Sequence, residues 1–231
     1  MSRREFDKFS QSYDELLKDP VRDAFTVGQS DFFHRRKYDL IRGYLARRRM
    51  DAKKLSYLDV GCGKGELASM LSSEFGRTAG CDPSTGMLGA IQGFEAREQT
   101  SPDRIPFGDR EFDFVTAVCV YHHVPPETRD SLTEEVFRVL KPGGVFCIIE
   151  HNPYNPATRL IVSRTPVDAD AILLRSAESR QRLRRAGLRI DAQEYFLYLP
   201  EPLYTRIASV ETWLSKLPLG GQYAVFAQRP S

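Results

Sequence analysis

Apolar residues in the first fifty positions recur at the three- and four-residue spacing of an amphipathic helix. This spacing predicts one helix over residues 5–17, which Pro20 ends, and a second over residues 30–49. Ser30 is the expected N-cap of the second helix, because a serine side chain can accept a hydrogen bond from a backbone amide at a helix start. The chain is therefore predicted to begin with a helical segment.

From residue 55 the pattern changes to short, continuously apolar runs that alternate with helical spacing. Strands that are apolar throughout are typical of a parallel sheet covered on both faces. Alternation of strand and helix therefore predicts an α/β fold with right-handed crossovers. The predicted strands are residues 55–60, 77–81, 112–120 and 145–149, and the predicted helices between them are residues 66–75, 84–97 and 126–140.

The last third of the chain has a looser pattern. A helix is predicted over residues 175–186, followed by strands over 188–199 and 222–228 with a helix over 208–217 between them. We expect the two late strands to form an antiparallel pair at the edge of the sheet. Residues 153–170 show no clean period, so we interpret them as an insertion near the site and not as a separate domain.

Length and charge narrow the range of functions. A chain of 231 residues suits a single domain, with N-terminal helices (1–50), a core (55–150) and a final segment (151–231). The 33 basic and 31 acidic residues give a net charge of +2, which argues against a dedicated nucleic-acid binder. No apolar run approaches the ~20 residues of a membrane span, and the polar N-terminus has no hydrophobic signal core. We expect a soluble, cytoplasmic protein without an integral membrane segment.

The chain has four cysteines, none in a CxxC pair and none at metal-like spacing with a histidine. Each falls in or just after a predicted buried strand, so reduced core thiols are expected and no metal site is. They are Cys62, Cys81, Cys119 and Cys147.

Residues 59–65, which read DVGCGKG, lie between a predicted strand and a predicted helix. Glycines at alternate positions let the backbone turn tightly and approach a ligand closely. Asp82 follows Gly61 by 21 residues, at the end of the next predicted strand. A carboxylate there is placed to accept hydrogen bonds from ribose hydroxyls. Loop and carboxylate together favour a nucleoside-containing ligand over a merely structural turn.

The dinucleotide-binding fingerprint needs a glycine at position 66, where this chain has Glu66. With Asp59 ahead of it, the loop instead resembles that of the class I S-adenosylmethionine-dependent methyltransferases. The resemblance covers residues 55–150 and is strongest to the small-molecule branch with quinone-biosynthesis and natural-product enzymes. Its other segments are residues 80–84 (GCDPS), 105–107 (IPF), 111–115 (EFDFV), 122–123 (HH) and 138–144 (RVLKPGG).

The resemblance implies a Rossmann-like, seven-stranded, mostly parallel sheet with an antiparallel edge pair, helices on both faces and an N-terminal helical lid. It implies S-adenosylmethionine as the cofactor and a small molecule as the acceptor. Tyr13 resembles the aromatic residue of the lid and is expected either to fold over the donor or to pack within its own helix.

The resemblance also implies residue roles at the methionine end of the donor. Gly61, Cys62 and Gly63 let the chain pass beside the methionine part. Asp59 holds its ammonium, directly or through water, and Asp82 takes the ribose.

Further roles concern the adenine ring and the donor carboxylate. Pro83 and Met87 belong to the segment that follows Asp82, and Met87 or the neighbouring Leu88 is expected to pack on adenine. Arg35 or Lys37 would reach the carboxylate, although charges on helices are more often solvated. The family often has an aspartate that bonds the adenine amino group, and here that slot holds Ser101.

Three of the four histidines follow the fourth and fifth predicted strands: His122, His123 and His151. Open α/β sheets bind ligands at the carboxyl ends of their strands, and a histidine suits proton transfer near neutral pH. We expect His123, and next His151, to act as a base on a hydroxyl acceptor, with His122 turned into the core. Glu150 is adjacent to His151 and is placed to orient a histidine.

Two aromatic segments bear on the acceptor. Residues 150–156 are polar and turn-rich, where this branch adapts to its acceptor. Residues 195–204 are rich in aromatic side chains and have two readings, as the lining of a pocket for an aromatic or lipid-like acceptor or as a strand that faces the core. We favour the core.

Three functions remain in contention on sequence alone. The leading one is methyl transfer to a small molecule, with oxygen slightly favoured over nitrogen or carbon. The second is a catalytically idle donor-binding fold that serves as a partner or regulator. The third, a nicotinamide-dependent oxidoreductase, is disfavoured by the loop spacing and Asp59.

Overall fold

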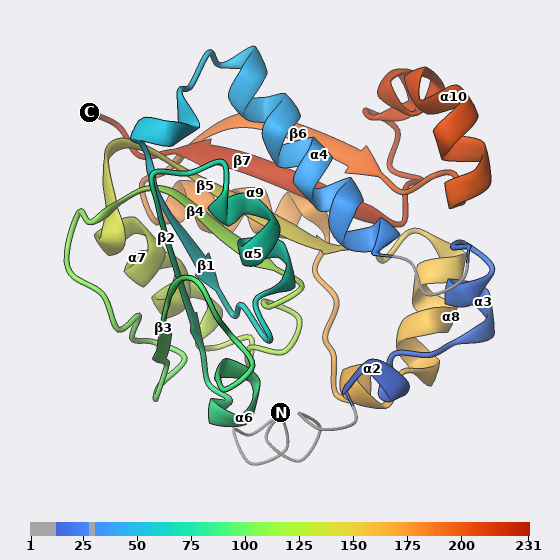
Figure 1. Ribbon diagram of the computed structural model, residues 1–231, viewed down its shortest axis with the longest axis horizontal. Coiled ribbons are helices and arrows are strands. Elements are labelled where there is room, and N and C mark those ends of the chain that lie inside the picture. Colours follow the sequence, from blue (N-terminus) through green and yellow to red (C-terminus); the bar gives the residue numbers. More distant parts are fainter. Residues whose placement is uncertain (1–12, 28–30) are drawn as a thin grey trace.

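The computed structural model describes residues 13–27 and 31–231. Its centre is a seven-stranded sheet in the order β3-β2-β1-β4-β5-β7-β6 (Figure 1). Strands β1 to β5 pair in parallel, whereas β7 is antiparallel to both of its neighbours. The sheet is the Rossmann-like mixed sheet predicted from the sequence, with the late strands paired antiparallel at its edge. The strands are β1 (Ser56–Val60), β2 (Arg77–Asp82), β3 (Glu95–Glu98), β4 (Phe112–Val118), β5 (Leu140–His151), β6 (Arg189–Phe196) and β7 (Gln222–Gln228).

Helices cover both faces of this sheet. In Figure 1, α4 (Phe32–Arg47) and α5 (Glu66–Ser72) lie in front of the strands. Behind the strands lie α7 (Arg129–Val139) and α9 (Ser176–Arg185). Burial on both faces is the reason that the central strands are largely apolar.

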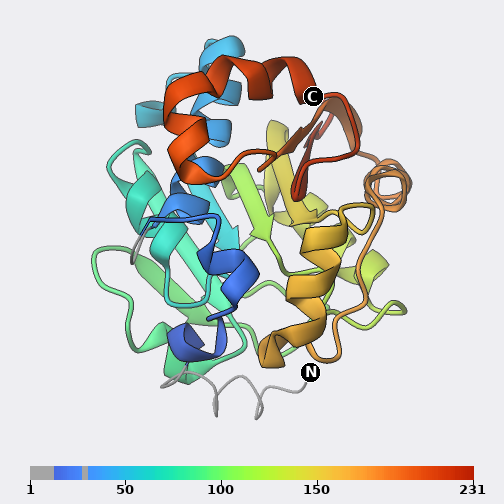
Figure 2. The ribbon, with the colours of Figure 1, turned by 90° about the vertical axis from the view of Figure 1, so that its right-hand side faces the viewer.

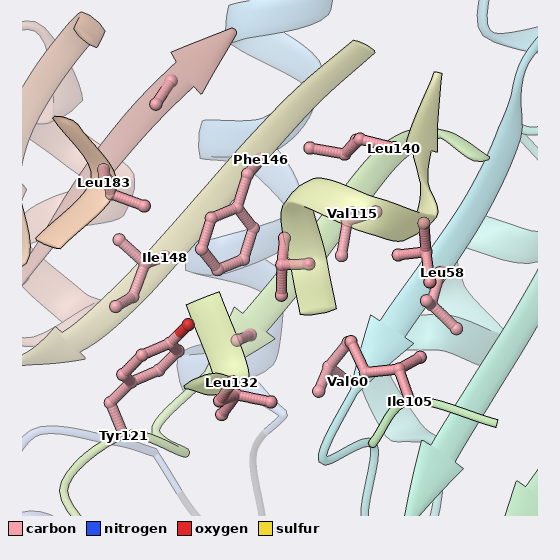
Figure 3. Close-up of a cluster of buried hydrophobic side chains, with 14 of the residues drawn as sticks. Leu58, Val60, Ile105, Val115, Tyr121, Leu132, Leu140, Phe146, Ile148 and Leu183 are labelled. Carbon is pink, nitrogen blue, oxygen red and sulfur yellow. The ribbon is translucent and has the colours of Figure 1, made fainter. Parts of the chain in front are cut away.

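Strand β5 shows how alternate side chains build two cores. Phe146 and Ile148 pack in one cluster with Leu132 of α7 and Leu183 of α9 (Figure 3). The alternate residues Val145, Cys147 and Ile149 belong to a second cluster with residues of α4 and α5, on the opposite face. A rigid, doubly covered sheet therefore holds the loops at the carboxyl ends of its strands.

The N-terminal segment forms two short helices rather than one. Residues 5–12 of the predicted helix lie outside the described residues, and α2 covers only Tyr13–Leu16. Pro20 does not merely end the stretch; it begins α3 (Pro20–Asp23), because Asp19 caps that helix by accepting from two backbone amides. The predicted cap of α4, Ser30, also lies outside the described residues.

The predicted helix over residues 84–97 is wrong. Only α6 (Thr85–Leu88) is helical, and the third strand of the sheet, β3, occupies residues 95–98. Three glycines in this stretch disfavour a longer helix, and Gly93 has a φ of +88°. Pairing with β2 then stabilises a four-residue strand with little apolar pattern of its own.

The interval 153–170 holds more regular structure than its pattern predicts. Pro156–Arg164 form α8, with Asn155 as N-cap and Pro156 at the first helical position. A 3-10 turn, η2 (Pro166–Asp168), follows it. Helix α10 (Glu201–Leu214) starts earlier than predicted and is interrupted at Ile207. Figure 2 shows α8 beside the N-terminal helices, on the side of the molecule where the central strands end.

Candidate active site

A cavity of about 1250 Å³ opens at the carboxyl ends of the central strands. Its walls come from the loops after β1, β2, β4 and β5, from the N-terminal segment, and from α8 and η2. The volume exceeds the roughly 300–1,000 Å³ of a typical single-ligand pocket. The cavity therefore has room for two reactants side by side.

The glycine loop forms one wall of the cavity. Two of its positions require glycine for different structural reasons. Gly61 has a φ of +69°, and a Cβ there would lie 2.4 Å from Cγ2 of Val120. Gly63 has a φ of +57°, but among the described residues, apart from its own chain neighbours, no heavy atom lies within 4 Å of the place of its Cβ. Gly61 thus allows the close approach of the chain after β4, whereas the open space beside Gly63 is available to a ligand.

Asp82 ties this loop to the end of β2. Its Oδ2 accepts the Gly63 amide at 2.8 Å, and its Oδ1 accepts the Ser84 amide at 2.9 Å. Each carboxylate oxygen can accept more than one hydrogen bond, so the anchored group can still receive two ribose hydroxyls. Pro83 and Met87 line the same end of the cavity, and Ser84 fixes Met87 by capping α6.

Asp59 lies beneath the glycine loop with 3% of its surface exposed. The Thr116 hydroxyl donates to its Oδ1 at 2.6 Å. Burial raises the pKa of Asp59 to about 7, although Thr116 and the ammonium of Lys37 both lower it. A cation bound against this carboxylate would restore the charged form.

The structure separates the two candidates for the donor carboxylate. Lys37 is buried and lines the cavity. Arg35 is not among the described residues that line it, because its guanidinium pairs with Asp31 at 2.8 Å and with Glu201 at 2.9 Å. Two residues apart on one helix, the side chains point about 200° away from each other. Of the two residues that the sequence offered, Lys37 and not Arg35 is among the described lining residues, which leaves Lys37 as the candidate for the donor carboxylate.

At the adenine end, the sequence predicted that Ser101 would face the donor, but Ser101 is not among the described residues that line the cavity. Its hydroxyl bonds the carboxylate of Asp103, and the described lining passes from Thr100 to Pro102 without it. Gln99 is buried there, and its backbone N–H donates to the backbone carbonyl of Asp82. Residues of the lid region line the cavity as expected of a cover; for Tyr13 itself only the backbone, within α2, is described.

The three predicted histidines meet at the other end of the cavity, which all of them line. The His122 and His151 rings lie 5.1 Å apart, and the His122 and His123 rings 4.1 Å apart. His122 Nδ1 lies 2.6 Å from Glu150 Oε2. Asp168 Oδ1 lies 3.4 Å from Nε2 of both His122 and His123. Sequence reasoning missed Asp168, because η2 belongs to the aperiodic interval and carries no local motif.

The charges of this cluster are set by burial and by two carboxylates. Burial would lower the pKa of His122, but Glu150 and Asp168 raise it to about 10. Burial and the neighbouring His122 lower the pKa of His123 to about 3 and that of His151 to about 4. These shifts favour the charged form of His122 and the neutral forms of His123 and His151 at neutral pH.

The remaining walls are largely apolar, with side chains from the N-terminal segment, α8 and the end of β6: Leu17, Phe25, Phe33, Ile161 and Leu197. Of the aromatic segment 195–204, only Leu197 is among the described lining residues, and Tyr195 and Phe196 are buried in the cores. The core reading of that segment fits its placement. All four cysteines are free thiols; three are buried and Cys119 is half-buried.

Known proteins share both the sequence pattern and the fold. Residues 58–148 match the family described as a methyltransferase domain. The demethylmenaquinone methyltransferase of Lactococcus lactis is 31% identical over 169 residues, 64% of this chain and 65% of that protein. A methyltransferase from Archaeoglobus fulgidus that depends on S-adenosylmethionine has a TM-score of 0.61 at 20% identity, covering 83% of this chain and 94% of that one. The middle of this chain therefore matches a methyltransferase domain, and the chain shares its fold with a methyltransferase that depends on S-adenosylmethionine.

A second quinone enzyme is among the relatives. The chloroplastic 2-phytyl-1,4-beta-naphthoquinone methyltransferase of Arabidopsis thaliana is 35% identical over 132 residues, 51% of this chain and 50% of that protein. The chain thus spans between half and two thirds of the length of these two relatives. The family resemblance read from the sequence is confirmed, and these matches give the nicotinamide-dependent alternative no support.

The methyltransferase cavity fits S-adenosylmethionine on observations of the structure itself. The open space beside Gly63 lies next to the anchored carboxylate of Asp82, and the buried pair of Asp59 and Lys37 offers opposite charges to an amino acid. Within the described residues, none of the helices has both the length and the apolar character needed to cross a bilayer.

Proposed function

We propose that this methyltransferase transfers a methyl group from S-adenosylmethionine to a hydroxyl oxygen of a small, largely apolar acceptor. One observation carries the proposal. A single cavity extends from the ribose-type carboxylate of Asp82 to the histidines after β4 and β5, with apolar walls between them. The cavity thus offers a donor end, an acceptor end and a place for proton transfer.

At the donor end, each charged part of the ligand meets a group of the opposite charge. Asp82 accepts the ribose hydroxyls, Asp59 holds the ammonium, and Lys37 holds the carboxylate. Pro83 and Met87 pack against the adenine ring. Gly63 leaves the space through which the methionine part passes. These roles use groups that are already fixed by hydrogen bonds or by burial, so little ordering is required on binding.

The donor supplies an electrophilic methyl group on a sulfonium. The protein's own task is then to hold the acceptor in line with that methyl and to exclude water. The N-terminal helices suit the second role, because residues from both α2 and α3 line the cavity opposite the strand ends. Closure by such a lid before reaction is a common device.

At the acceptor end, a histidine removes the hydroxyl proton. His123 is the preferred base because it follows β4, lines the cavity and has a neutral ring at neutral pH. His151 is the second choice, and the charged ring of His122 stabilises the oxyanion that forms. The rate of a reaction that needs a neutral histidine rises with pH around the pKa of that histidine, which is ordinarily about 6.5. Because His123 is buried beside His122, its pKa is lowered, and the rise in rate is expected at acidic pH.

The acceptor is proposed to be a hydroxylated ring with an apolar substituent, such as a quinol. The apolar side chains along the cavity support this class, and two relatives bear names for methylation of naphthoquinone-type molecules. Oxygen is preferred over ring carbon as the methylated atom because buried groups that can take a hydroxyl proton surround the acceptor end.

Product analysis tests the proposal. Purified protein is incubated with deuteromethyl-labelled S-adenosylmethionine and a panel of hydroquinones and phenols that differ in chain length, and the products are identified by mass spectrometry and NMR. A methyl ether is the expected product. A methylated ring carbon or amine would refute the oxygen assignment. Tight binding of S-adenosylhomocysteine without any product across the panel would favour a donor-binding regulator instead.

A further inference from the structure

Three side-chain atoms at the acceptor end lie near one another, at separations longer than those of good hydrogen bonds. Asp168 Oδ1 is 3.4 Å from Nε2 of His122 and 3.4 Å from Nε2 of His123. Hydrogen bonds between nitrogen and oxygen are usually 2.7–3.2 Å long. All three atoms lie within 4.8 Å of one another.

The 3.4 Å separations match the geometry of ligands around one metal ion. Zinc binds imidazole nitrogen at about 2.0–2.1 Å and carboxylate oxygen at about 2.0–2.2 Å, in tetrahedral sites. The edge of such a tetrahedron is about 1.6 times the bond length, which gives roughly 3.3–3.5 Å between ligand atoms. Both contacts of Asp168 therefore have the length expected for two ligands of a common ion.

The second observation is the setting of His122. The side chain is 1% exposed, and its Nε2 has no hydrogen-bond partner within the described part of the chain. Its Nδ1 is held by Glu150 Oε2 at 2.6 Å. Glu150 is itself fixed, because its other oxygen accepts the amides of Val120 and Tyr121 at 3.0 and 2.7 Å. Metal-binding histidines are typically oriented in this way, with a carboxylate on the nitrogen that faces away from the ion.

We propose that His122 Nε2, His123 Nε2 and Asp168 Oδ1 form a binding site for a divalent transition metal ion of the zinc class, in which the ion replaces the proton on His122 Nε2 and takes over the role of its positive charge. Glu150 is the positioning residue that directs His122 toward the ion. Three protein ligands with a fourth position toward a cavity are the arrangement of catalytic zinc sites, and all three of these residues line the cavity. The cysteine spacing gave no sign of this site, since its ligands come from the loop after β4 and from η2.

The metal site itself does not depend on the proposed function. A catalytic use of the bound ion does rest on the proposed function. The ion would bind the acceptor oxygen at its open position and lower the pKa of the hydroxyl. The O–H bond breaks, and the proton passes to His151 in place of His123, because His123 Nε2 then binds the ion and His151 remains outside the ligand set. The oxygen then forms its bond to the methyl group as the methyl–sulfur bond breaks, so the sulfonium becomes a neutral thioether.

Cobalt titration of untagged, chelator-treated protein tests the site without any acceptor. We expect one Co²⁺ per chain with the visible absorption of a four-coordinate ion, displaced by Zn²⁺. Asp168→Ala and His123→Gln should each weaken binding about 100-fold or more, and Glu150→Gln about 10- to 100-fold with the cobalt spectrum retained. Asp170→Ala is the matched control, because Asp170 is exposed two residues beyond the site and should leave the affinity unchanged.

Circular dichroism establishes that each variant is folded before its affinity is measured. Absence of a cobalt spectrum in the folded wild-type protein would overturn the site, as would equal affinity in the wild type and Asp168→Ala. If the ion binds but a chelated enzyme methylates at full rate, the catalytic use fails while the proposed function stands. If the ion binds and no acceptor is turned over, the proposed function fails while the site stands.

Discussion

The buried carboxylate of Asp59 makes donor binding depend on pH. Its pKa is raised to about 7, and we expect only the ionised form to hold the ammonium of the donor. About one molecule in ten is then ionised at pH 6 and about nine in ten at pH 8. The affinity for S-adenosylhomocysteine should therefore rise about tenfold from pH 6 to pH 8, or by about 1.4 kcal/mol, and then level off.

Isothermal titration calorimetry across this range measures the effect. The matched variant is Asp59→Asn, which keeps an oxygen for the Thr116 hydroxyl but cannot titrate. Its affinity should be lower at pH 8 and nearly flat with pH. The clustered histidines do not mask the trend, because the pKa values of His122, His123 and His151 lie outside the window. The role of Asp59 would be refuted if the affinity of the wild type did not change with pH, or if the affinities of the wild type and Asp59→Asn changed equally with pH.

The same raised pKa has a consequence for the free protein. A carboxyl whose pKa is higher in the folded state than in the unfolded chain binds its proton more tightly when folded. The free energy of unfolding that this proton binding adds is therefore fully present at acidic pH. It is lost as pH rises from about 4, the pKa in the unfolded chain, to about 7, the pKa in the folded protein. Asp59→Asn should lack this loss, so its Tm relative to the wild type should be higher at pH 8 than at pH 5. An unchanged Tm difference would contradict the burial argument.

Four further outcomes are expected. Asp82→Ala should weaken S-adenosylhomocysteine binding about 10- to 150-fold, the equivalent of about 1.5–3 kcal/mol for lost hydrogen bonds to a charged group; Ser84→Ala, which removes the hydroxyl that caps α6, controls for local destabilisation. Gly63→Ala should cost about 1–2 kcal/mol of stability for its positive φ and reduce calorimetric binding well beyond that, whereas intact affinity would show that the open space is not used. His123→Ala should lower turnover roughly 10²–10⁴-fold with donor affinity unchanged, and activity within a few-fold would mean catalysis by positioning alone. Deletion of residues 1–18 should leave a folded core by circular dichroism with reduced turnover, and full activity would remove the lid role.

Much of the methyltransferase fold could be predicted because its signals are local. The continuously apolar strands, the glycine loop and Asp82 at a strand end each depend on the conformation of a few neighbouring residues, which the sequence states directly. The strand β3 was missed for the opposite reason. Its four residues are half-polar, and pairing with β2 rather than their own periodicity makes them a strand.

The sequence by itself indicated the glycine loop and Asp82 at one end of the site and the three histidines at the other, whereas only the tertiary structure decided between Lys37 and Arg35 and brought Asp168 to the histidines. Loop and strand-end residues belong to one βαβ unit, so their spacing fixes their geometry. Lys37 faces the cavity, and Arg35 does not, because packing on the sheet sets the rotation of α4. Asp168 meets His122 because η2 folds back over a strand end more than forty residues earlier in the chain. Side-chain encounters between such distant segments follow from how the elements pack, and no local pattern encodes them.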